Sequence, residues 1–78
     1  MSNYPSVTGR KLIKELLRRG YIQVRKKGSH VSIRSPKDKF VITVIPDVTE
    51  DLGKNLLGDI KKQLRLSSKN FIKILECC

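Results

Sequence analysis

The spacing of apolar residues changes at Gly20, and this change restricts the folds open to the chain. Before the glycine, apolar residues recur every three or four positions, as on one face of a helix. They are Leu12, Ile13, Leu16 and Leu17. After the glycine, apolar and polar residues alternate, which is typical of half-buried strands. One helix followed by short alternating strands predicts an α+β fold.

The first helix is predicted to begin after Thr8, whose side chain can accept a hydrogen bond from a free backbone amide. Val7 can pack onto Leu12 across this start. Gly20 can take the left-handed conformation that ends a helix. The charged residues of the segment are expected to face water, and they are Lys11, Lys14, Glu15, Arg18 and Arg19.

Two paired strands are predicted over residues 21–26 and 29–34, joined by a tight turn at residues 27–28. This register places Arg25 opposite His30. One face then carries Ile22, Val24, Val31 and Ile33, and the other carries Tyr21, Gln23, Arg25, His30, Ser32 and Arg34. A slip of one residue would mix the two sets, so the register is a strong expectation.

A third strand is predicted over residues 40–45, after a polar connection, with Phe40, Ile42 and Val44 on the core side. Helical spacing then returns in Leu52, Leu56, Leu57, Ile60 and Leu64. The preceding residues Thr49, Glu50 and Asp51 suit the cap and first turn of that helix. Ser67 is expected to cap a short last helix that buries Phe71, Ile72 and Leu75.

These elements predict one domain over residues 1–78, because a chain of this length has no room for a second module. The expected order is α-β-β-β-α with a short C-terminal helix. Short connections favour a three-stranded antiparallel sheet with the helices on one face. The opposite face is expected to be open, polar and cationic.

The charge of the chain predicts a polyanionic partner. Seventeen Lys and Arg residues against seven Asp and Glu give a formal net charge of +10. RNA, DNA, an acidic membrane and an acidic protein all fit that charge. Residues 1–10 lack the hydrophobic segment of a secretory signal, so a cytoplasmic protein without membrane attachment is expected. Cys77 and Cys78 are adjacent and cannot close a useful loop, so we expect free thiols.

The stretch RKKGSHVSIR holds the only histidine, His30, beside three consecutive cations. RNA can be cut without a metal when one group takes the proton of the 2′-hydroxyl and cations stabilise the charge on the phosphate. Nearby positive charge favours the neutral imidazole that a base requires. The candidate catalytic residue is therefore His30. The candidate RNA-binding residues are Arg25, Lys26, Lys27, Gly28 and Ser29.

Other chemistries find little support in the sequence. The acidic residues show no metal-ligand spacing around His30, which argues against a metal-dependent nuclease. The cysteines have no base near them in sequence, and the glycines do not form a phosphate-binding loop. No metal or cofactor is therefore expected. A lone histidine beside basic residues is, however, more often an ordinary surface side chain than a catalyst.

Two segments make the chain resemble the HicA toxins of toxin–antitoxin pairs. They are TGRKLIKELLRRGYIQVRKKGSHVSIR and IKKQLRLSSKNFIKIL. The resemblance implies a fold like the double-stranded-RNA-binding domain, endonucleolytic cleavage of messenger RNA, and silencing by a HicB-type antitoxin. It also implies that His30 is catalytic, with Gly28 and Ser29 leading into it. Many members have a second histidine after the proline that ends the third strand, whereas here Pro46 is followed by Asp47.

Two other functions remain open at this stage. The chain could recognise structured RNA by shape without cutting it. Glu50 and Asp51 argue against this, because acidic residues at the start of the long second helix would repel phosphates. The basic surface could also serve an acidic protein partner, which is compatible with a toxin that an antitoxin silences.

Overall fold

The structure is a computed structural model that describes residues 4–78. It contains α1 (Gly9–Arg18), β1 (Ile22–Lys27), β2 (His30–Arg34), β3 (Ile42–Pro46), α2 (Lys54–Gln63) and α3 (Ser68–Glu76). The three strands form one antiparallel sheet in the order β1-β2-β3, which confirms the predicted α+β class. A single domain over 1–78 stays a prediction, and residues 1–3 lie outside the described part.

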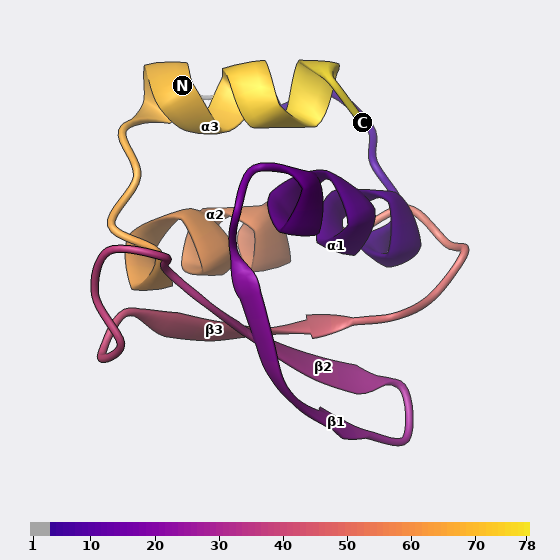
Figure 1. The fold of residues 1–78 in the computed structure, drawn as a ribbon. Helices are drawn as coiled ribbons and strands as arrows, with labels where there is room; N and C mark the ends of the chain where they lie inside the picture. The colour runs from indigo at the N-terminus through magenta and orange to yellow at the C-terminus, as the bar shows by residue number, and fades with distance from the viewer. Residues whose placement is uncertain (1–3) are drawn as a thin grey trace.

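The elements form successive layers (Figure 1). The sheet is the lowest layer in this view, α1 and α2 cover one of its faces, and α3 lies beyond them. The core between the layers includes Leu12, Leu16, Ile33, Ile45, Ile60 and Phe71, none of which is exposed to solvent. No helix of residues 4–78 covers the other face of the sheet, as predicted.

The ends of α1 confirm the local signals of the sequence. The Thr8 side chain accepts a hydrogen bond from the Lys11 amide at 3.2 Å, and Val7 is buried against the core. Glu15 was expected to face water, but this was wrong, because only 5% of it is exposed. Leu17 was expected on the apolar stripe and is instead 38% exposed, since the stripe is narrower than predicted.

Gly9 allows α1 to approach the end of β3 closely. A Cβ atom at this position would lie 1.7 Å from the carbonyl oxygen of Pro46. No side chain fits there, because atoms cannot approach to that distance without a backbone shift. The glycine therefore fixes how α1 meets the sheet edge nearest the β1–β2 turn.

The predicted hairpin register is wrong. The turn residues are Gly28 and Ser29, and Lys27 pairs with His30. Gly28 has a φ of 60°, and a two-residue turn with positive φ at its first central position favours glycine there. A bulge between Gln23 and Arg25 shifts the rest of β1.

The bulge changes which residues of β1 face the core. Gln23 pairs with buried Ile33, and Ile22 pairs with Arg34 on the open face. Ile22 and Val24 were predicted in the core, but they are 38% and 46% exposed. Val31 and Ile33 are buried as predicted.

The predicted orientation of the third strand is also wrong. Val41, Thr43 and Ile45 face the core, and Phe40, Ile42 and Val44 are exposed. The hydroxyl of buried Thr43 is hydrogen-bonded to the side-chain oxygen of Gln63 in α2. Satisfying this polar group allows a threonine to occupy the core side.

The second helix begins later than predicted. Gly53 is its N-cap and no acidic residue lies in its first turn. Asp51 instead forms an isolated bridge with Thr8, in extended backbone that a helix cannot include. The predicted cap of α3 is confirmed, because the Ser67 hydroxyl accepts a hydrogen bond from the Asn70 amide at 3.2 Å. The buried residues of α3 are Phe71, Ile74 and Leu75, so Ile74 takes the place predicted for Ile72.

Candidate functional site

His30 is the first residue of β2 and is exposed to solvent at the hairpin tip. It pairs with Lys27 of β1 on one side and with Pro46 of β3 on the other. Its ring makes no hydrogen bond within residues 4–78. The imidazole is therefore open to an incoming substrate, on the sheet face that the helices leave uncovered.

The tip is anchored from β3. The amide of Asp47 donates a hydrogen bond to the carbonyl oxygen of Ser29. Together with the Gly28 turn, this contact fixes the backbone directly before His30. The two residues predicted to lead into the site thus shape it through their backbone.

The three predicted cations divide between the two faces of the sheet. Lys27 pairs with His30 and Arg25 pairs with Ser32, so both belong to the open face. Paired side chains lie about 5 Å apart at Cβ, which places Lys27 beside the imidazole. Lys26 pairs with buried Val31 and belongs to the other face.

Lys26 contacts a carboxylate that the sequence analysis did not place in the site. Its ammonium lies 3.6 Å from Asp47, whose other oxygen accepts a hydrogen bond from Arg10 at 3.1 Å. The hydrogen bond from Arg10, and then the charges of Arg10 and Lys26, lower the pKa of Asp47. The only sequence signal for this residue was its position directly after Pro46.

The open face is more apolar than predicted. Ile22, Ile42 and Val44 are 38%, 44% and 46% exposed, and Ile42 and Val44 pair with Arg34 and Ser32. These three residues, which we call the open-face patch, lie on the same side of the sheet as His30. Ile42 and Val44 are neighbours on β3, and Arg34 of β2 lies between Ile42 and Ile22. Exposed apolar area bordered by polar residues is typical of a surface that a partner covers.

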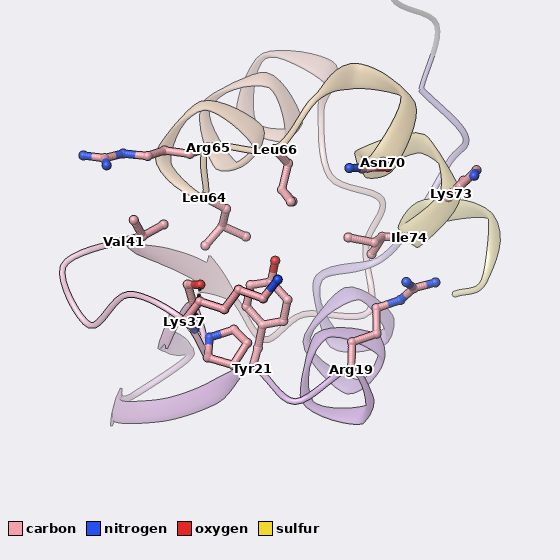
Figure 2. Close-up of a pocket in the computed structure, with 12 residues that line it drawn as sticks. Arg19, Tyr21, Lys37, Val41, Leu64, Arg65, Leu66, Asn70, Lys73 and Ile74 are labelled. Atoms are coloured by element: carbon pink, nitrogen blue, oxygen red, sulfur yellow. Dashed lines mark hydrogen bonds between the residues drawn. The ribbon is translucent and has the colours of Figure 1, made fainter.

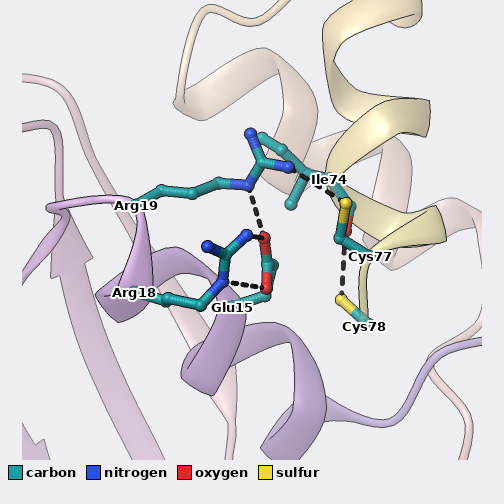
Figure 3. A network of polar contacts seen from close by, with 6 residues as sticks. All are labelled: Glu15, Arg18, Arg19, Ile74, Cys77 and Cys78. Atoms are coloured by element: carbon teal, nitrogen blue, oxygen red, sulfur yellow. Dashed lines mark hydrogen bonds and ion pairs between the residues drawn. The ribbon is translucent and has the colours of Figure 1, made fainter.

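A second polar cluster lies at the end of α1 (Figure 3). Both Glu15 oxygens accept hydrogen bonds from Arg18, at 2.9 and 2.6 Å, and one also accepts from Arg19 at 2.6 Å. The hydrogen bond from Arg18 is the main reason that the pKa of Glu15 falls to about 2. Arg19 also lies 3.3 Å from Cys77, which is a free thiol. This cluster joins α1 to the end of α3.

Within residues 4–78, no group of three or more His, Cys, Asp or Glu side chains is placed to hold a metal ion. None of the helices described is both long and apolar enough to cross a bilayer.

One protein family matches the part of the chain that contains His30, its turn and Asp47. The family described as the HicA toxin of bacterial toxin–antitoxin systems matches residues 9–66. That span runs from Gly9 through the His30 turn and Asp47 to the end of α2, and it is well over half of the 78 residues. The chain belongs to the HicA toxin family. It is thus a toxin of a toxin–antitoxin system, as the first quoted segment indicated, whereas most of the second segment lies beyond the matched residues. Comparison with curated proteins gave no match.

Proposed function

We propose that this HicA toxin is a metal-independent endoribonuclease that cleaves messenger RNA, with His30 as its catalytic residue. The observation that carries the proposal is the exposed imidazole of His30 at a fixed turn, with Lys27 directly opposite. A base and a cation in this arrangement can act together on one phosphodiester. Family membership supports the substrate class, since the resemblance implies messenger RNA.

The reaction requires one proton acceptor near the 2′-hydroxyl of the RNA. His30 takes that proton, the 2′-oxygen forms a bond to phosphorus, and the bond from phosphorus to the 5′-oxygen breaks. Asp47 stands where many members have a second histidine, so the leaving 5′-oxygen takes its proton from water. The products are a 2′,3′-cyclic phosphate and a 5′-hydroxyl.

The cations have different parts in this proposal. Lys27 and Arg25 lie on the face of His30 and stabilise the charge that develops on the phosphate. Lys26 is held by Asp47, so it supports the turn more than it contacts RNA. Gly28 and Ser29 contribute their backbone. It forms the turn directly before His30, where it can approach a phosphate.

A HicB-type antitoxin is proposed to cover the same face. The open-face patch offers apolar area for a stable interface, and the surrounding cations attract an acidic partner. An antitoxin seated there would bury His30 and exclude RNA. No new conformation of the toxin is needed for silencing.

Binding of structured RNA without cleavage is the alternative. One observation supports this alternative. Glu50 and Asp51 precede α2, and the first turn of α2 contains Lys54 and no acidic residue. The start of a helix without acids is compatible with a phosphate. This function predicts salt-dependent RNA binding, unchanged by His30→Ala, with no cutting at all.

The ends of the RNA fragments test the proposed chemistry. Purified toxin is incubated with single-stranded RNA in excess chelator, and the fragments are analysed by mass spectrometry. We expect 2′,3′-cyclic phosphate and 5′-hydroxyl ends. Fragments with 5′-phosphate ends would exclude attack by the 2′-hydroxyl.

A further inference from the structure

A cleft of about 500 Å³ opens at the end of the sheet opposite the His30 turn (Figure 2). It lies between the β2–β3 loop and the connection from α2 to α3. In Figure 2, Leu64, Leu66 and Ile74 point toward the ring of Tyr21. Leu64 and Ile74 are only 4% exposed, so the apolar wall is rigid. A cleft of this size lies in the range of small-molecule sites.

The rim of the cleft is positively charged. Lys37, Arg65, Lys73 and Arg19 line it, and none of the described residues that line it is acidic. Arg19 is held by Glu15, but the other three make no ion pair within residues 4–78. An apolar wall with an aromatic ring and a cationic rim fits a ligand that is flat at one end and anionic at the other.

Arg65 occupies a position where its backbone is strained. Its φ is 55°, and it is the only non-glycine residue from 4 to 78 with a positive φ. The amides of Arg65 and Leu66 donate to the carbonyls of Lys62 and Lys61, at 3.1 and 3.0 Å. This is the Schellman motif, in which the left-handed residue is usually glycine.

The left-handed conformation ends α2, but the stability of α2 does not explain why the residue is an arginine instead of a glycine. A basic residue near the end of a helix interacts favourably with the helix dipole. Lys61 and Lys62 already supply that charge in the last turn of α2, in ordinary helical backbone. Residues held in strained backbone conformations occur often at functional sites. The arginine side chain at the cleft rim is the feature that a glycine would lack.

We propose that this cleft binds a nucleotide, with the base against Tyr21 and the leucines and the phosphate at the cationic rim. Figure 2 shows Arg65 and Lys73 on opposite sides of this rim, with their side chains extending outward, and Lys37 between them. Stacking on an aromatic ring tolerates any base, and an arginine provides planar donors for phosphate oxygens. The cleft is separate from the catalytic residue, because β2 is five residues long and places His30 roughly 17 Å away.

The nucleotide has two possible sources. It can be one unit of the RNA substrate, in which case the inference rests on the proposed function, or it can be a free mononucleotide. Both offer the same base and phosphate. The test uses separate probes for the two sources.

The experiment follows backbone amide signals by NMR in the full chain carrying His30→Ala, so that RNA stays intact. The probes are AMP, a single-stranded hexaribonucleotide and inorganic phosphate. We expect saturable shifts at Tyr21, Arg65 and Leu66 with AMP or the hexamer. Arg65→Gly should weaken this binding about tenfold while keeping the fold, because glycine relieves the strain.

Lys69→Ala is the matched control, since it removes one charge from α3 outside the cleft. It should change the affinity less than about twofold.

Shifts of the cleft's amide signals with AMP and none with the hexamer assign the cleft to a free nucleotide. Shifts with the hexamer alone assign it to the RNA strand. The proposal is overturned if neither probe shifts the cleft, if phosphate alone binds as well as AMP, or if Arg65→Gly and Lys69→Ala weaken binding equally. RNA that binds the cleft but is never cut by the wild-type chain would contradict only the nuclease.

Discussion

The backbone amide of Asp47 is hydrogen-bonded to the carbonyl oxygen of Ser29, so the residue after β3 holds the turn before His30. The carboxylate of the same residue holds Arg10 of α1 and Lys26 of β1. One acidic residue thus connects three elements around the hairpin tip. Because Lys26 is paired with this carboxylate and lies on the other face from His30, we propose that it contributes less to RNA binding than Lys27.

Lys27→Ala and Lys26→Ala form a matched pair that tests this division. Lys27 lies opposite His30, so its loss should lower the rate of RNA cleavage about tenfold or more. Lys26 is on the other face, and its loss should change the rate less than about twofold. The measurement is the single-turnover cleavage rate at saturating enzyme. Equal losses in the two variants would show that the lysines act only through net charge.

Gly9→Ala should destabilise the fold strongly. The added methyl group would overlap the carbonyl oxygen of Pro46, and such overpacking typically costs about 1–3 kcal/mol. Urea unfolding followed by circular dichroism measures the change in the free energy of unfolding.

Gly58→Ala is the control for this prediction. Gly58 lies within α2 and no atom would contact its added Cβ. Alanine there should stabilise the chain by about 0.5–1 kcal/mol, since glycine is a poor helix former. A Gly9→Ala chain as stable as wild type would show that α1 can move away from β3 at little cost.

Glu15 should make the toxin sensitive to acid. Its pKa is about 2 in the folded chain against an ordinary value of 4.5, mainly because of the hydrogen bond from Arg18. The Glu15 carboxylate therefore binds a proton more readily in the unfolded chain than in the folded chain. The stabilisation that its charge gives the fold above pH 4.5 is lost as the pH falls toward about 2.

The variant Glu15→Gln isolates this effect. Urea midpoints of both chains are compared at neutral pH and at about pH 3, where other carboxylates titrate alike in the two chains. The advantage of the wild type should shrink in acid. A difference that stays constant with pH would mean that the Glu15 charge contributes nothing.

The open-face patch should be needed for silencing by the antitoxin. Ile42→Asn removes apolar area without changing the net charge, and the residue is already 44% exposed, so the fold should persist. We expect at least about tenfold weaker antitoxin binding by calorimetry, with the cleavage rate almost unchanged. Leu17→Asn makes a similar change on α1, away from the sheet. Similar weakening in both variants would place the antitoxin elsewhere.

Local signals predicted most of the element boundaries. Thr8 and Ser67 cap helices through hydrogen bonds to amides three residues later, and such contacts depend only on nearby sequence. The class of fold followed from these boundaries and from the period of the apolar residues. The exposed position of His30 also followed, because its neighbours Val31 and Ile33 had to face the core.

The predictions of strand orientation and burial failed where both faces of a strand were apolar, or where a residue distant in sequence determined which side faces the core. In residues 40–45 each alternating set is largely apolar, so the period does not identify the core side. Gln63 of α2 determines the core side of β3, because its side chain forms the hydrogen bond that the buried Thr43 hydroxyl requires. The β1 bulge and the burial of Glu15 likewise depend on tertiary contacts. The division of Arg25, Lys26 and Lys27 between two faces required the correct register.

Cleavage of single-stranded RNA by wild type and His30→Ala, in excess chelator, tests the central claim most directly. The ring is exposed and makes no hydrogen bond within residues 4–78, so the alanine variant should fold and bind RNA normally. We expect its cleavage rate to fall by about 10²- to 10⁴-fold. Cleavage by the variant at the wild-type rate would contradict the account.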